Sequence, residues 1–146
     1  MLRPYVCVAC EKVILAQDGV ASLVSLFSKI VINLRADAPE IPTNALAPKE
    51  WVVFSAWDLE LGDELREYFL STQLSYPDGA PFGEVGRVRM NLEAGRRLQM
   101  VSQFLAFPIG ETGLYTVGTW IEENNRRVVG PIEFRIELEI VRQRQP

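Results

Sequence analysis

Apolar and charged residues alternate strictly near the end of the chain. Single polar or charged positions from Glu133 to Glu139 separate five apolar ones. A period of two places the apolar set on one face of a β-strand and the charges on the other, whereas a helix would mix the two sets. The pattern predicts a strand whose buried face carries Ile132, Phe134, Ile136, Leu138 and Ile140.

The same alternation recurs over residues 68–76 and, more briefly, over residues 87–92. Residues 61–74 also carry apolar side chains at roughly helical spacing, so pattern alone leaves a helix open there. The aromatic and threonine content of this segment and the Pro77-Asp78-Gly79 turn behind it favour a strand.

Three other segments are apolar on both faces: residues 20–32, 51–57 and 98–107. Strands of this kind are either central in a sheet with both faces covered, or they lie in an interface with another subunit. Self-association through such strands is therefore one prediction for this chain.

Turn sequences divide the chain into stretches of strand length. They are Asp18-Gly19, Asp78-Gly79, the segment from Gly110 to Gly113, and Asn124-Asn125. Gly, Asn and Asp supply the positive backbone φ angles that tight hairpins need. We predict an all-β fold, an antiparallel β-sandwich of about seven to nine strands of Greek-key (immunoglobulin-like) type, formed by residues 1–146 as one domain.

One long connection interrupts this spacing. Residues 35–50 carry Pro39, Pro42 and Pro48. Loops of this length are uncommon in compact domains and often bind ligands or cross between sheets. The segment is the best loop candidate for a function.

Several stretches resemble a bacterial family of small β-sandwich proteins of unknown function. They are the opening residues 6–13, the turn Gln17-Asp18-Gly19 with the strand at residues 21–27, the hairpin at residues 74–79, and residues 107–115. The resemblance covers most of the chain except residues 35–50 and 93–97. It implies a fold and carries over no catalytic residue. The family has an acidic pair after the opening strand, and Glu11-Lys12 departs from it.

The composition of the chain limits the classes of partner that we expect it to bind. The 146 residues carry a net charge of −4, so the chain lacks the positive field that a phosphate backbone requires, and we expect no nucleic-acid partner. No segment has eighteen uninterrupted apolar residues, and charges close the apolar run at residues 5–10, so we expect no membrane span. Two cysteines in a chain of this size fit free thiols in a cytoplasmic protein.

The residue inventory argues against an enzyme. The chain contains no histidine, which excludes catalytic triads and histidine-metal sites. Cys7 and Cys10 have the spacing of a redox pair, but three positions apart on a strand they point to opposite faces, so we expect buried structural thiols. We predict no catalytic residue, no cofactor and no metal site.

Acidic and aromatic residues leave alternatives open. Asp58, Glu60, Asp63 and Glu64 are expected to form a solvated rim, with carboxylate catalysis or Ca²⁺ binding as weaker alternatives. Gly113-Leu114-Tyr115 resembles a tyrosine corner, in which the hydroxyl bonds to the backbone just upstream. The candidate binding residues are Trp51, Trp57 and Trp120, which would form a sugar-stacking platform if they do not fill the core.

Two classes of function follow from these observations. The first is a non-enzymatic protein-interaction or structural module, acting as a homo-oligomer or as the partner of another protein. The second is a module that binds a small ligand or a carbohydrate through its aromatic residues and its proline-rich loop.

Overall fold

The computed structural model describes residues 1–93 and 97–144, and these residues form strands and a single short 3-10 turn. The all-β prediction is confirmed. The elements are β1 (Arg3–Leu15), β2 (Ala21–Leu26), β3 (Lys29–Arg35), β4 (Leu46–Ala47), β5 (Trp51–Asp58), η1 (Asp63–Leu65), β6 (Phe69–Ser75), β7 (Pro81–Arg89), β8 (Leu98–Phe104), β9 (Phe107–Pro108), β10 (Gly113–Glu123) and β11 (Arg126–Gln143).

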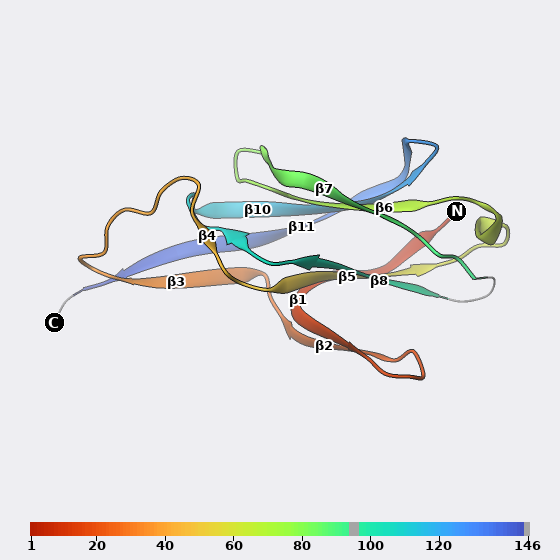
Figure 1. The fold of residues 1–146 in the computed structure, drawn as a ribbon, viewed down its shortest axis with the longest axis horizontal. Coiled ribbons are helices and arrows are strands. Elements are labelled where there is room, and N and C mark those ends of the chain that lie inside the picture. The colour runs from red at the N-terminus through yellow and green to blue at the C-terminus, as the bar shows by residue number, and fades with distance from the viewer. Residues whose placement is uncertain (94–96, 145–146) are drawn as a thin grey trace.

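Two main sheets lie in separate layers (Figure 1). Sheet A has four strands in the order β2-β1-β5-β8, and sheet B has five in the order β3-β11-β10-β6-β7. Sheet B is curled, and the small β4–β9 pair lies at one end of the layers. None of the described residues forms a helix long and apolar enough to cross a bilayer.

Three of the four predicted turns join paired strands, while the segment from Gly110 to Gly113 connects β9 to β10 without a hairpin. Gly19 and Gly79 have φ angles of 84° and 90°, and Asn124 and Asn125 have φ angles of 51° and 60° in the β10–β11 hairpin. The alternation in the last strand is also confirmed, because Ile136 and Leu138 are buried in β11 while Glu137 between them is exposed. Residues 69–75 form strand β6, so the helical alternative for that segment is wrong.

The prediction that all strands are antiparallel is wrong for one pair. Strand β3 runs parallel to β11, with Ile30 beside Leu138 and Ile32 beside Ile140. The cause lies in residues 20–32, which form two strands in different sheets rather than one strand. Because the chain leaves sheet A at the end of β2 and enters sheet B at Lys29, no hairpin sets the direction of β3 against its neighbour.

The main core lies between the sheets. Trp51 and Val53 of β5 pack against Tyr115 and Val117 of β10, while Trp57 packs in a second cluster with Tyr68 and Ile121. A third cluster lies on the opposite face of β5, where Val52, Phe54 and Ala56 are covered by apolar residues of the β1–β2 hairpin. Strand β5 is therefore buried on both faces, as the sequence predicts.

Candidate functional site: an open groove beside strand β8

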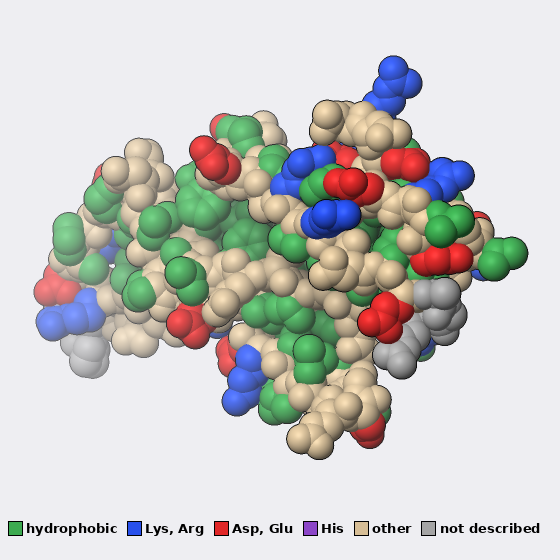
Figure 2. Space-filling model, turned by 45° about the vertical axis from the view of Figure 1, so that its right-hand side comes forward, with side chains coloured by type: hydrophobic (Ala, Val, Ile, Leu, Met, Phe, Trp, Pro, Cys, Tyr) green, Lys and Arg blue, Asp and Glu red, His purple; other side chains and the backbone are tan. Residues whose placement is uncertain are grey.

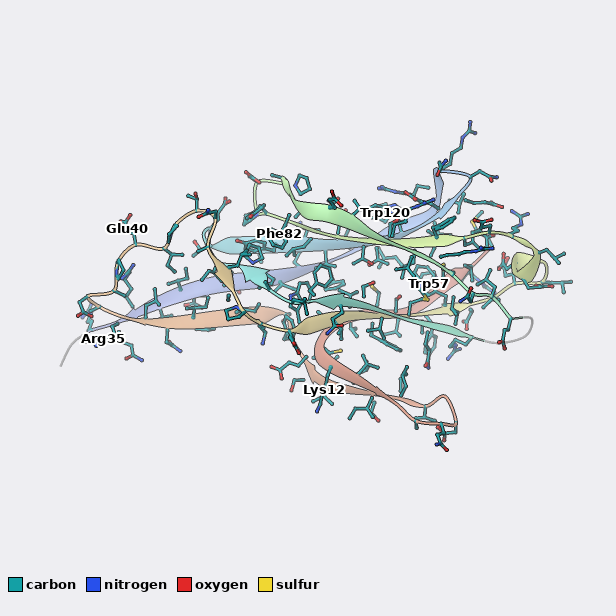
Figure 3. All side chains as sticks on the ribbon, viewed as in Figure 1. Lys12, Arg35, Glu40, Trp57, Phe82 and Trp120 are labelled. Carbon is teal, nitrogen blue, oxygen red and sulfur yellow. The ribbon has the colours of Figure 1, made fainter. Side chains whose placement is uncertain are left out.

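The three tryptophans do not form an exposed platform. Trp51 and Trp57 have no exposed area, and the Nε1–H group of Trp57 donates to Ser55 Oγ at 3.0 Å inside the core. Figure 3 shows Trp57 between the two layers. Trp120 lies on sheet B with 8% of its surface exposed, and the guanidinium of Arg127 sits 4.4 Å from the centre of a Trp120 ring. No described tryptophan presents a free ring face for a sugar.

The two cysteines lie on opposite faces of β1, as predicted. Cys7 points toward sheet B, where its Sγ lies 3.8 Å from Thr119 Oγ1, and Cys10 is buried in the cluster beneath the β1–β2 hairpin. Burial raises the pKa of both thiols. The arrangement keeps both sulfurs protonated at neutral pH, which is the opposite of what a redox pair needs.

The acidic residues between β5 and β6 are engaged in local contacts. Asp58 accepts from Arg97 Nε at 2.8 Å, and Asp63, only 2% exposed, accepts from the Tyr68 hydroxyl at 3.0 Å and the Glu60 amide at 2.8 Å. The expected solvated rim is therefore wrong for Asp63, which is an internal anchor of the turn. Across the described residues, no three Asp, Glu or Cys side chains are arranged to hold a metal ion.

Opposing effects set the pKa of Asp63. Burial alone raises it, but the hydrogen bonds from the Glu60 amide and the Tyr68 hydroxyl and the nearby amino group of Met1 outweigh burial and lower it. The partner group responds in the other direction, because burial and the bond to Asp63 raise the pKa of Tyr68 to about 12. The carboxylate is thus held ionised as a structural acceptor.

The proline-rich loop is fastened at both ends. Arg142 of β11 donates to the carbonyl oxygens of Ala38 and Pro39, and the Ile109 amide donates to Ala45 O at 3.0 Å. Gly110 lies so close to the loop that an added Cβ would be 2.2 Å from Thr43 O. These contacts hold residues 35–50 beside Ile109 and β11, and most side chains of the segment stay exposed.

The structure instead leaves an open groove along one side. Strands β7 and β8 are edge strands of sheets B and A, and both line a groove of about 410 Å³. Apolar and uncharged polar side chains make up most of its wall, with Glu84 as its carboxylate. Its lining includes Thr72, Phe82, Gly86, Val88, Ser102 and Phe104.

The groove exists because sheet B extends one strand further than sheet A on this side. Strand β8 lies over β6, where Thr72 Oγ1 and Ser102 Oγ are 3.2 Å apart and hydrogen-bonded. Strand β5 lies over β10, so no described strand of sheet A lies opposite β7, the next strand after β6. Phe82, labelled in Figure 3, lies at one end of this uncovered part of β7. The groove occupies the place that a fifth strand of sheet A would fill.

The free edge of β8 lacks the features that usually prevent strands from pairing with other chains. Its seven residues contain no charge, proline or glycine, and its register with β5 is regular throughout. Strand β7 is different: it begins at Pro81, carries Glu84, Arg87 and Arg89, and contains a bulge opposite Thr72 to Leu74. Strand β2 is also uncharged, but Ser25 interrupts it with a φ angle of 56°.

Apolar side chains surround this edge. Val101 and Leu105 are 42% and 67% exposed, and Val88 across the groove is 48% exposed. The prediction that residues 98–107 are covered as a central strand is wrong, because β8 lies at an edge with its outer face open. The other alternative for such a strand, an interface with another chain, is what this placement favours.

The arginines near the groove are already paired. Arg87 lies over the ring of Phe69 and bonds to Glu122 Oε2 at 2.9 Å, and Arg89 lies 3.9 Å from Glu67. Acidic and basic side chains are accordingly intermixed on the upper surface (Figure 2). Glu84 differs from them, because no cation in the part of the chain that the structure describes lies within ion-pair distance of it.

Comparison with known proteins assigns neither a family nor a function to this chain. No family model, curated protein or solved structure matches this chain. The resemblance inferred from the sequence therefore stays a prediction, and the site rests on the geometry of the groove.

Sequence reasoning marked residues 98–107 as either a central or an interface segment, and it did not single out the β7 side of the groove. The signal that was present is an apolar segment, residues 98–105, with no charged or breaking residue in it. Whether such a segment is covered or open depends on which strands lie beside and opposite it, and that is a property of sheet order.

Proposed function

We propose that this chain is a non-enzymatic protein-interaction module, a β-sandwich of Greek-key type, that binds an extended segment of another protein along β8. The observation that carries the proposal is the missing fifth strand of sheet A beside an unprotected edge. An added strand would pair with the free backbone groups of β8 and cover the exposed face of β7 in one step. Backbone pairing would supply affinity, and side chains entering the groove would supply selectivity.

A single extended segment fits the groove better than a second copy of this chain. If β8 of a second copy paired with β8, that strand would bring its own β6 beneath it, as Thr72 and Ser102 join the two strands in this copy. The place beneath is already occupied by β7 of the first copy. A peptide strand with no sheet of its own meets no such obstacle.

Carbohydrate binding through Trp51, Trp57 and Trp120 has no comparable support. Two of these rings have no exposed area, and the third lies under Arg127. The non-enzymatic part of the proposal rests on the absence of histidine from the sequence and on the engagement of Asp58 and Asp63 in local contacts.

Site-specific photo-crosslinking in the native host tests the proposal. A photoreactive phenylalanine analogue at Val101, which is exposed beside the groove, should give a discrete protein adduct on irradiation. The control carries the analogue at Leu114, which is 47% exposed on β10 and is not part of the groove lining, and should not give that adduct.

A groove-blocking variant completes the test. Gly86 lines the groove, and an added Cβ would make only an ordinary 3.6 Å contact with Thr72 O, so Gly86→Leu should fold normally and fill the groove. The adduct at position 101 should then disappear. No adduct at position 101, or one that persists in correctly folded Gly86→Leu, contradicts the proposal.

A further inference from the structure

The groove carries chemical information about the segment that would occupy it. This inference rests on the proposed function and specifies the ligand of the same site. The residues of β7 that line the groove are Phe82, Gly83, Glu84, Gly86 and Val88. Apolar positions therefore flank one carboxylate, and a glycine beside them leaves space for a large side chain.

The pairing between strands shows which residues on the two walls of the groove lie directly opposite each other. Gly86 pairs with Thr72, and Thr72 is bonded to Ser102, so Gly86 and Ser102 lie at the same level on opposite walls of the groove. A residue of the added strand beside Ser102 would face Gly86 and the neighbouring Val88. Because Gly86 has no side chain and Val88 is 48% exposed, this level accepts a bulky apolar side chain.

Glu84 lies two residues from Gly86 along β7. Gly86 lies opposite Thr72 and Phe82 lies opposite Leu74, so the bulge fits the four residue steps from Phe82 to Gly86 into the length of two residues of β6, about 6.8 Å, and Glu84 lies within that interval. The next side chain on the same face of the added strand would come level with Phe82, where the long side chain of a lysine or arginine reaches Glu84. Arg87, the arginine nearest in sequence, is held over Phe69 by its contact with Glu122 and does not neutralise this carboxylate. Among the described residues Glu84 has no cation partner, and a carboxylate of this kind at the wall of an apolar groove favours a basic side chain in the ligand.

We infer that the groove selects extended protein segments in which an apolar residue and a lysine or arginine stand two positions apart, the apolar side chain toward Gly86 and Val88 and the cation toward Glu84. Either chain direction satisfies this spacing. An anionic segment would place two like charges together at Glu84 and is selected against.

Selection from a random library of twelve-residue peptides displayed on phage tests the inference. The wild-type protein, Glu84→Gln, Glu84→Lys and Gly86→Leu are used as parallel baits, and Glu133→Gln, which changes an exposed glutamate on β11, is the matched control. Wild type and Glu133→Gln should enrich the same apolar-x-Lys/Arg spacing. Glu84→Gln should enrich apolar segments without the basic preference, and Glu84→Lys should prefer Asp or Glu at that position.

Binding of a synthetic peptide from the selection gives the size of the effect. Its affinity should fall about threefold to fivefold in Glu84→Gln and remain unchanged in Glu133→Gln, and the difference should shrink in high salt. If the enriched peptides bind the wild type but not Gly86→Leu, and their sequences show no preference for lysine or arginine, this inference is overturned and the proposed function stands. If the enriched peptides bind Gly86→Leu as well as wild type, or if none are enriched, both proposals fail.

Discussion

Strands β5 and β8 are neighbours in sheet A and look alike in sequence, since each belongs to a segment that is apolar on both faces. In the structure, Trp51 to Trp57 of β5 are all buried, while β8 exposes Val101 and one whole edge. The difference arises from what lies around them. The β1–β2 hairpin covers the outer face of β5, and β1 and β8 pair with its two edges. Strand β8 pairs with β5 along one edge only, and no described element covers its outer face or pairs with its other edge.

The comparison shows that a strand can carry apolar residues on both faces for two different reasons. In β5 the apolar residues stabilise the fold, because every side chain is removed from water. In β8 the inner side chains do the same, since Phe104 stacks on Trp51 at 4.2 Å, but the outer ones gain little from folding. Apolar side chains that folding does not bury are available for binding.

Truncating one side chain on each strand gives the largest expected difference. Phe54→Ala on the covered face of β5 should reduce the free energy of unfolding by about 3–5 kcal/mol. Val101→Ala on β8 should change it by less than about 0.5 kcal/mol. Urea unfolding monitored by circular dichroism measures both. Equal losses would mean that the outer face of β8 is covered and would remove the distinction.

The connection that leaves β5 gives the second effect. Asp63→Asn should cost about 1–3 kcal/mol, because the amide cannot accept both the Tyr68 hydroxyl and the Glu60 amide in the same geometry. Folding lowers the pKa of Asp63 below its ordinary value of 3.8. The ionised carboxylate therefore stabilises the folded protein fully at pH values above 3.8, and this stabilisation is lost as the pH falls from 3.8 through the lower pKa of the folded state.

Unfolding measured in urea between pH 7 and pH 2 follows this loss. The wild type should lose stability across the acid range, and Asp63→Asn should lose less of it. Glu133→Gln, at an exposed position, serves as the control and should follow the wild type. Parallel curves for wild type and Asp63→Asn would refute the role of Asp63.

The packing around Trp51 extends to the start of β10 and gives a smaller effect. The Tyr115 hydroxyl donates to Glu111 O at 2.5 Å, and its ring packs on Phe107, which contacts Trp51. This is the hydrogen bond that the tyrosine-corner prediction requires. Tyr115→Phe should cost about 0.5–1.5 kcal/mol. Tyr76→Phe is the matched control. The Tyr76 ring lies next to that of Tyr115 and is partly exposed, and the Tyr76 hydroxyl forms no hydrogen bond with the described residues.

The smallest expected effect is local and needs no mutation. In β5, amides are paired with β1 or β8 and should exchange hydrogen slowly, while in β8 those that face the free edge should exchange faster at the same global stability. Hydrogen exchange with mass spectrometry resolves the two segments. Equal protection of both would show that another part of the molecule covers the β8 edge.

Much of the local structure could be predicted from sequence. Alternation placed Ile136 and Leu138 in the core, the Asp-Gly and Asn-Asn pairs marked the hairpins, and odd spacing separated Cys7 from Cys10. These results depend on the period of two of a strand and on the φ angles of turn residues. Both are properties of a few neighbouring residues.

The site could not be predicted in the same way. The parallel placement of β3, the burial of Asp63 and the groove beside β8 depend on which strands become neighbours. Aromatic residues drew attention to Trp51 and Trp57, but large rings gain most free energy when they are buried, and the sheets bury both. The residues that line the groove, Gly86 and Glu84 among them, carry no distinctive motif.

The sequence alone determined that this chain forms strands, where they turn, and which faces of β6 and β11 are buried, because hydrophobic burial acts on a pattern that each strand carries by itself. Only the tertiary structure decided that one sheet has four strands and the other five. Within the described residues that inequality leaves β7 uncovered and the edge of β8 free, since a strand can satisfy its backbone hydrogen bonds with neighbours from any part of the chain.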